Sequence, residues 1–238
     1  MIKIFDNEIN DLMHLLSAQK QTRYAYDEKK ALQTSDSSSL ILLKDTAFEL
    51  GGSDKPCAAS TVVTDSIALK NETIVVGKEL KDIKSDCNYA KFVLISLDDT
   101  PDDEQAIFDL VKSLEYAKYK ENVDGFMMRA STMLHREQVR VAKSAIKKGL
   151  SFEALGATTI KNYLSKPSVK AVSVIFVADS DVDFSHLCNF TSKTSEILKA
   201  FNHILDNVLV DCAHCSLREI CDEVDGMKEL HFKSAMKK

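Results

Sequence analysis

The sequence predicts an α/β fold: a layered domain with a mixed β-sheet, an N-terminal helical extension and a C-terminal cysteine-rich metal-binding tail. Three observations support this prediction. Short β-branched runs alternate with amphipathic segments of helical period. The continuous apolar run Phe92–Leu97 is typical of a strand buried on both faces. Finally, Cys212, Cys215 and Cys221 lie close together near the C-terminus.

The first 39 residues are expected to form the helical extension. Asp6 is a suitable N-cap for a helix over residues 6–32, and apolar residues follow it at helical spacing: Ile9, Leu12, Leu15 and Leu16. The small polar residues 34–39 are typical of a linker. We therefore divide the chain into residues 1–39, an α/β domain over residues 40–206, and a cysteine-cluster tail over residues 207–238.

In the middle domain, the apolar residues of some segments recur with the period of a strand, and those of others with the period of a helix. Strands are expected at residues 40–43, 47–50, 60–64, 73–77, 92–97, 124–131 and 169–177. The acids and proline of residues 98–104 indicate the start of a helix that runs to about residue 121. Further helices are expected at residues 134–148, 152–164 and 184–206.

Composition narrows the classes of partner. The chain has 238 residues, 45% of them hydrophobic, and a formal net charge of −5. An acidic balance argues against nucleic acid and against anionic membranes, because both attract basic surfaces. The sequence contains no run of about eighteen apolar residues, so no membrane-spanning helix is expected. The six cysteines, with no secretory signal in front of them, are expected to be reduced in a cytoplasmic location.

The spacing Cys-x2-Cys-x5-Cys of Cys212, Cys215 and Cys221 predicts a metal site. The first two thiolates can reach one metal from a single turn, and the third can close the site once a helix has begun. Thiolates are soft ligands, which favours zinc or an iron–sulfur cluster over calcium or magnesium. The compact run favours a [4Fe–4S] cluster, because structural zinc usually takes four protein ligands. Zinc stays an alternative, as do three reduced thiols without a metal.

A fourth ligand would come from Cys188, Cys57, Cys87 or His231, or be absent. Cys188 is expected in the helix that leads into the cysteine run, and we favour it over Cys57. An open or non-cysteine position is the alternative. Cys188 also lies on or beside the apolar stripe of its helix, so it could instead be a small buried residue of the core.

The helix expected at residues 134–148 is the one basic element in an acidic protein. Arg136, Arg140 and Lys143 would share one of its faces. Such a stripe could dock a partner with an acidic surface. It could equally be solvated, or neutralised by the protein's own carboxylates.

Five segments in chain order resemble the middle, non-catalytic α/β domain of acetyl-CoA synthase, the β-subunit family of the carbon monoxide dehydrogenase/acetyl-CoA synthase complex. The resemblance covers about residues 40–205, and its segments are Thr46–Gly52, Ile74–Leu80, Phe92–Leu97, Val139–Phe152 and Val172–Phe176. In that family the domain leads into cluster cysteines that open with a Cys-x2-Cys pair. The resemblance therefore extends to Cys212 and Cys215, and to Cys221 with a departure in spacing.

The resemblance implies a cytoplasmic iron–sulfur accessory protein for electron transfer or docking in one-carbon or corrinoid-linked anaerobic metabolism. The chain has no Cys-Gly-Cys nickel motif and only 17 residues after Cys221. It is therefore not expected to be a complete acetyl-CoA synthase. Implied partners are an acidic electron-transfer protein or a corrinoid or carbon monoxide dehydrogenase component. Two alternatives stay open: a metalloenzyme with an open metal position at the three cysteines, and an interaction module stapled by zinc.

Overall fold

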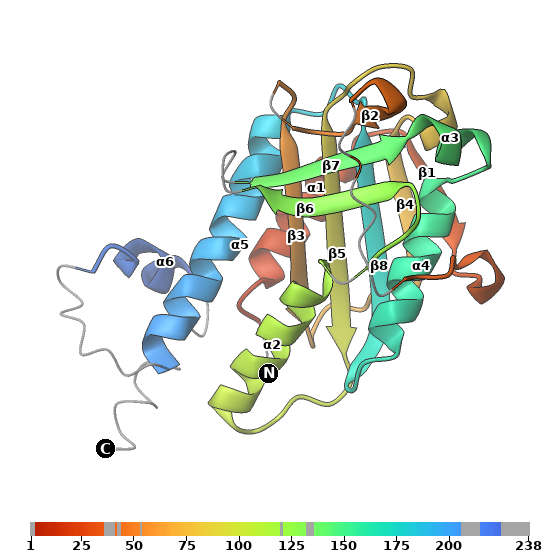
Figure 1. The fold of residues 1–238 in the computed structure, drawn as a ribbon. Coiled ribbons are helices and arrows are strands. Elements are labelled where there is room, and N and C mark those ends of the chain that lie inside the picture. Colours follow the sequence, from red (N-terminus) through yellow and green to blue (C-terminus); the bar gives the residue numbers. More distant parts are fainter. Residues whose placement is uncertain are drawn as a thin grey trace.

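The computed structural model describes residues 3–35, 41, 44–52, 54–119, 121–131, 136–205 and 215–224. These residues form a five-stranded sheet and a three-stranded sheet, with helices on both faces of the larger one (Figure 1). The mixed α/β class predicted from the sequence is confirmed. Of the cysteine-rich tail, residues 207–214 and 225–238 lie outside the described residues.

The five-stranded sheet forms the centre of the domain. Its strands, in spatial order, are β1 (Gln21–Ala25), β4 (Glu72–Gly77), β8 (Val169–Ala178), β5 (Tyr89–Leu97) and β3 (Cys57–Thr64). The pairs β4/β8 and β5/β3 are parallel, and the pairs β1/β4 and β8/β5 are antiparallel, so the sheet is mixed. Central strand β5 is buried along its whole length, as its continuous apolar sequence predicts.

One face of the large sheet is covered by α1 (Asp6–Ser17) and α5 (Phe184–Leu205). Side chains two apart on a strand share a face, so Ser60 and Thr64 of β3 point the same way. The hydroxyl of Ser60 lies 2.8 Å from that of Thr194 in α5. The hydroxyl of Thr64 donates to the Asp6 carboxylate at the start of α1, at 2.7 Å. Both helices therefore pack on the face to which these even-numbered residues point.

The other face is covered by α2 (Glu104–Ala117) and α4 (Phe152–Leu164). Thr61 of β3, one residue on from Ser60, lies 3.4 Å from the Tyr163 hydroxyl of α4. The same hydroxyl donates to the Leu114 carbonyl of α2 at 3.0 Å. These contacts place α2 and α4 opposite α1 and α5.

The three-stranded sheet has the order β2 (Ala47–Glu49), β7 (Arg136–Ala142) and β6 (Phe126–Ser131), and it is antiparallel throughout. Strands β6 and β7 cross in front of β3, β5 and β8, on the side of α2 and α4 (Figure 1). Phe126 is opposite Val141, and both belong to the same buried core as the large sheet. The small sheet is thus packed through its apolar face.

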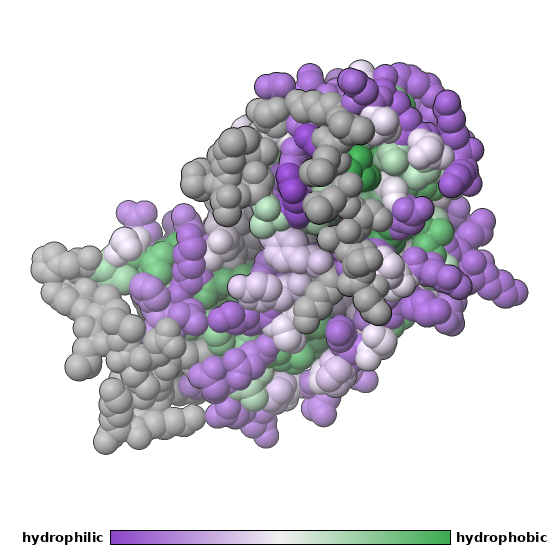
Figure 2. Space-filling model, viewed as in Figure 1, coloured by the Kyte–Doolittle hydropathy of each residue, from purple (hydrophilic) through white to green (hydrophobic). Residues whose placement is uncertain are grey.

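The remaining elements are short. They are the 3₁₀ helices η1 (Glu28–Lys30), η2 (Lys44–Thr46) and η3 (Leu80–Asp82), and the α-helices α3 (Lys143–Lys147) and α6 (Arg218–Glu223). In the part of the chain that the structure describes, no helix is both long and apolar enough to cross a bilayer. The face drawn in Figure 2 is mostly hydrophilic, with hydrophobic residues visible in small separate areas.

The predicted helix over residues 6–32 is correct only as far as Ser17. Residues 21–25 form β1, which pairs with β4 at the edge of the large sheet. The apolar residues at helical spacing stop at Leu16, and Phe5, Ile9, Leu12 and Leu16 are all buried in the main core. The segment is therefore neither wholly helical nor an appendage: it supplies one helix and one strand to the layers of the domain.

The predicted basic helix over residues 134–148 is wrong. Arg136–Ala142 is strand β7, and only Lys143–Lys147 is helical, as α3. Val139 and Val141 are separated by the charged Arg140. This period of two fits a strand with one apolar face. Pairing with β6 and β2 on both sides then decides the conformation. The other predicted helices and strands of the domain are confirmed, except the strand at residues 40–43, of which only Ile41 is described.

Candidate functional site

The predicted metal site lies in the cysteine-rich tail, of which the structure describes residues 215–224. Cys215 is in the turn before α6, and its carbonyl accepts from the Arg218 N–H at 3.2 Å. Cys221 is in α6, where its N–H donates to the Leu217 carbonyl at 3.1 Å. The third cysteine thus lies on a helix that begins after the Cys-x2-Cys pair, as the spacing predicts. Cys212 lies outside the described residues.

The cysteine helix α6 is docked on the long helix α5 (Figure 1). Val224, directly after α6, is buried, and Leu217, Ile220 and Cys221 pack against the main core. Hydrophobic residues are visible over the α6 region in Figure 2. A six-residue helix is too short to be stable alone in water, so these tertiary contacts hold Cys221 in place.

A charged contact reinforces this docking. Lys193 of α5 lies between two carboxylates, with its Nζ 3.1 Å from Glu8 Oε1 of α1 and 3.4 Å from Glu223 Oε2 of α6. Burial alone would lower the pKa of Lys193, but the bonds and charges of Glu8 and Glu223 outweigh it and raise the pKa. This three-residue contact, the Lys193 bridge, joins the first helix of the chain to the cysteine helix.

Cys188, the predicted fourth ligand, lies in α5 and is half-buried. It lines an open cavity of about 900 Å³ whose walls are formed by residues of α2, α5, the start of β3, β6 and β7. Cys57, the second candidate, lines the same cavity. We call this space the α2–α5 cavity. Among the described residues, no three His, Cys, Asp or Glu side chains are grouped so that they could hold a metal ion. The structure therefore does not bring Cys188 together with Cys215 and Cys221.

Cys87 is not among the described residues that line the α2–α5 cavity. It is buried beside Leu50, and its N–H donates to the Glu49 carbonyl at 3.1 Å. Burial raises the pKa of its thiol from 9.0 to about 11, with a further contribution from the negative charge of Asp179. Cys87 is therefore held as a thiol at neutral pH.

The α2–α5 cavity also contains a charged cluster that the sequence did not predict. Lys118 lies 2.6 Å from Glu115 and 3.3 Å from Glu137, and the Tyr119 hydroxyl donates to Glu137 at 3.0 Å. Burial, and then the charge of Glu137, raise the pKa of Tyr119 to about 12, although Lys118 opposes them. Lys118 thus offsets part of the negative charge of Glu115 and Glu137.

The three residues of the predicted basic stripe do not form an exposed face. Arg140 is buried, and its guanidinium binds Glu49 Oε2 through Nε at 3.2 Å and Nη2 at 3.1 Å. Its Nη1 donates to the Ile41 carbonyl at 2.9 Å. Lys143 donates to the Asp45 carbonyl and lies over the Phe48 ring. The side chain of Arg136 lies outside the described residues.

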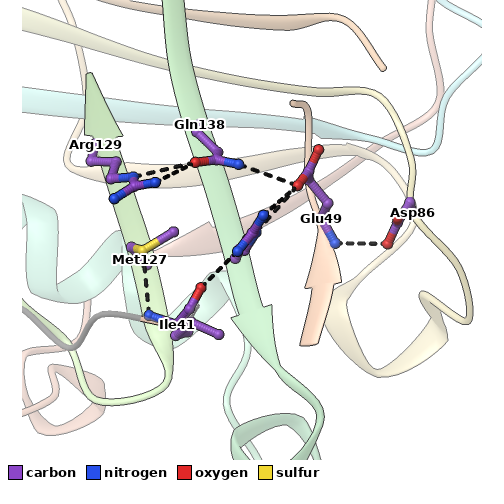
Figure 3. Close-up of polar contacts among 7 residues, drawn as sticks. Ile41, Glu49, Asp86, Met127, Arg129 and Gln138 are labelled. Atoms are coloured by element: carbon purple, nitrogen blue, oxygen red, sulfur yellow. Dashed lines mark hydrogen bonds and ion pairs between the residues drawn. The ribbon is translucent and has the colours of Figure 1, made fainter. Parts of the chain in front are cut away.

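The sequence left open the alternative that the protein's own carboxylates neutralise the basic residues. In the structure, Glu49 neutralises Arg140 in this way. Gln138 extends the network: it donates to Glu49 and accepts from the exposed Arg129 (Figure 3). The prediction that Arg136, Arg140 and Lys143 form a partner-binding helix face is therefore wrong. The segment that contains the two arginines is a strand, and Arg140 is buried.

A second buried polar cluster was not predicted from the sequence. Lys91 of central strand β5 lies 2.8 Å from Glu121 Oε2 and donates to Thr159 of α4 at 3.0 Å. The hydroxyl of fully buried Tyr89, two residues earlier, has no hydrogen-bond partner in the described part of the chain. The signal that could have found the cluster is a single lysine in an otherwise apolar strand, since such a charge needs a buried partner.

The fold and site define a mixed α/β protein that carries a cysteine helix docked on its longest helix. Neither the known family models nor the curated proteins contain a match to this chain. The resemblance to the acetyl-CoA synthase family therefore stays a prediction from the sequence.

Proposed function

We propose that this chain is an iron–sulfur accessory protein related to acetyl-CoA synthase, which serves electron transfer or docking in one-carbon or corrinoid-linked metabolism. Cys212, Cys215 and Cys221 would hold a [4Fe–4S] cluster. The observation that carries the proposal is the placement of Cys215 in a turn and Cys221 in the helix that follows, on a segment anchored to the body of the protein.

The donor set fits a soft metal centre. The described thiols of Cys215 and Cys221 are both half-buried, so a group bound there would be partly shielded from water yet near the surface. Anchoring by Val224 and the Lys193 bridge supports the site, because less conformational entropy is lost when the ligands are already placed. When bound, such a cluster supplies one-electron chemistry at a potential set by its surroundings.

The protein's own contribution is to hold and partly cover the cluster. The α/β body supplies α5 as a rigid support, and α6 presents Cys221 from it. An acidic electron-transfer protein, or a corrinoid or carbon monoxide dehydrogenase component, would have to approach this side of α5. Localisation in the cytoplasm is part of the same proposal.

Anaerobic purification tests the proposal. We expect about four irons per chain and broad thiolate-to-iron absorption. Replacing Cys221 with serine should remove most of the iron. Cys87→Ser is the matched control, because Cys87 is a buried cysteine outside the tail whose pKa is raised by burial. Stoichiometric zinc without iron after anaerobic reconstitution would replace this proposal with the zinc-stapled module.

A further inference from the structure

The α2–α5 cavity is large enough to hold a small molecule. Its volume of about 900 Å³ falls within the range of about 300–1,000 Å³ that is typical of ligand-binding clefts. Phe108 of α2 lines it and makes an edge-to-face contact with Phe201 of α5, with the ring centroids 5.2 Å apart. The two helices that border the cavity are therefore fixed to each other by a contact of the core.

Polar side chains that are almost completely buried form part of the cavity wall. Ser60 of β3 and Thr194 of α5 both line it, and their hydroxyl oxygens are 2.8 Å apart. Thr194 donates its proton to the Thr191 carbonyl at 3.0 Å, so Ser60 is the donor between the two hydroxyls. Because a hydroxyl oxygen has two lone pairs, both keep the capacity to accept a further hydrogen bond. The wall thus offers acceptors to a polar ligand.

The charges around the cavity balance. The charged side chains among the described lining residues are Lys112, Lys118 and Lys199 on one side and Glu115, Glu137 and Glu196 on the other. His203 also lines the cavity and adds a charge only when it is protonated. A phosphate or a polycarboxylate is held by an excess of cations, often arginines. The balance therefore favours a ligand without a net charge.

Hydroxyl groups and an exposed aromatic ring line the same space. Thr191, Ser192 and Ser195 follow one another on the cavity side of α5 at intervals that place residues on one helical face, and both serines are exposed. Tyr116 of α2 lines the cavity and is 54% exposed, and no other large hydrophobic residue is exposed in the part of the chain that the structure describes. An exposed ring offers a flat apolar surface beside groups that both donate and accept hydrogen bonds.

From these features we propose that the α2–α5 cavity binds a neutral sugar. A sugar ring has a face of C–H groups that can lie on Tyr116, and a rim of hydroxyl groups that can exchange hydrogen bonds with Thr191, Ser192 and Ser195. A sugar phosphate fits less well, because the lining has no excess of cations. The inference goes beyond the proposed function, since the cavity is lined by neither Cys215 nor Cys221.

The test uses the full-length protein, purified anaerobically, with maltose, cellobiose, lactose and N-acetylglucosamine as probes at millimolar concentration. We expect at least one of them to raise the thermal midpoint. The same sugar should slow the alkylation of Cys188 by iodoacetamide about 3-fold when it is present at twice its Kd, because Cys188 lines the cavity. Mass spectrometry compares this rate with that of Cys221, which should not change. Sorbitol at equal concentration corrects for the general stabilisation by excluded polyols.

Two substitutions at Tyr116 test the role of the ring. Tyr116→Ala should weaken binding of the active sugar about 10-fold, whereas Tyr116→Phe, which keeps the ring, should bind it like the parent. Because Tyr116 is exposed, both variants should fold, and the thermal midpoint without sugar verifies this.

Three results would overturn the proposal. The first is that none of the four sugars protects Cys188 or raises the midpoint beyond the effect of sorbitol. The second is that glucose 6-phosphate or adenosine protects Cys188 while the neutral sugars do not, which would assign the cavity to another class of ligand. The third is that Tyr116→Ala binds the sugar as tightly as the parent does, because the sugar would then lie elsewhere.

Discussion

At the scale of single residues, this protein buries charges that the sequence suggested were exposed. Arg140 and Glu49 form an ion pair that is almost completely shielded from water, and Gln138 shares the same carboxylate. A buried charge is costly unless it is paired and hydrogen-bonded. The arginine that was expected to attract a partner therefore serves the stability of the small sheet.

Replacing Arg140 with methionine should lower the free energy of unfolding by about 3 kcal/mol, because Glu49 would stay buried without its cation. Urea denaturation followed by circular dichroism measures this change. The control is Arg129→Met, on the neighbouring strand, whose exposed side chain should contribute no more than about 0.5 kcal/mol. Equal losses in the two variants would contradict a buried ion pair at Arg140.

The buried thiol of Cys87 predicts a pH dependence. Its pKa is raised from 9.0 to about 11 by burial, so between these values the folded state keeps a proton that the unfolded state has lost. Stability should therefore be fully present below pH 9 and fall as the pH rises towards 11, by at most about 3 kcal/mol from this group.

The measurement is urea denaturation of the parent and of Cys87→Ala at pH 8 and pH 10.5. The difference in unfolding free energy between the two proteins should shrink or change sign at the higher pH, because alanine has no proton to lose. A parallel course for Cys87→Ala would show that its thiol ionises at an ordinary pH.

At the scale of elements, α6 illustrates how a short helix is held by its neighbours. It has no side-chain cap at its N-terminus, and its apolar residues are directed to α5 and the core. The Lys193 bridge is its charged contact with the body, and both Lys193 and Glu223 are partly exposed. Partly exposed ion pairs contribute about 0.2–1 kcal/mol, which is modest for a domain but substantial for a helix of six residues.

Glu223→Gln should accordingly loosen α6 without affecting the rest of the protein. In the metal-free protein we expect iodoacetamide to alkylate Cys221 about 2- to 5-fold faster, which corresponds to about 0.5–1 kcal/mol of lost anchoring. Mass spectrometry of the tail peptide gives the rate. Glu196→Gln makes the same chemical change on α5, at an exposed residue without a described ion pair, and should leave the rate unchanged. If both variants react like the parent, the bridge does not anchor the helix.

At the scale of the whole molecule, α1 and the cysteine helix α6 both contact α5, which lies on one face of the large sheet. α1 packs beside α5 and supplies Ile9, Leu12 and Leu16 to the main core, while β1 closes the sheet at the edge next to β4. The cysteine helix docks on the same side through Glu8 and Lys193. The first 25 residues are thus part of the support of the candidate site.

Leu12→Ala should therefore destabilise the entire domain by about 2–5 kcal/mol, in a single cooperative thermal transition. Leu15→Ala is the matched control on the same helix, and since Leu15 is only half-buried its cost should be clearly smaller. Were residues 1–39 a separate extension, the thermal midpoint of the domain would be unaffected by either change. Differential scanning calorimetry distinguishes the two cases.

Prediction from the sequence succeeded where local pattern and tertiary environment agree. The run Phe92–Leu97 can only be buried as a central strand, and Phe152–Leu164 begins at a Ser151 cap that accepts from the Ala154 N–H. It failed at Arg136–Ala142, where charged residues four apart suit a helix and alternating valines suit a strand. Pairing with β6 and β2 decided between them, and no window of the sequence contains those partners.

For the candidate site, the sequence by itself determined the three cysteines and the helix that carries the third, because ligand spacing is a local property. It also determined the mixed α/β class, since the two hydrophobic periods alternate along the chain. The tertiary structure alone decided that Cys188 and Cys57 line the same cavity, and that Arg140 is paired with Glu49. Both outcomes depend on contacts between segments far apart in the chain, and the free energy of burying a side chain is set by the neighbours that the fold brings to it.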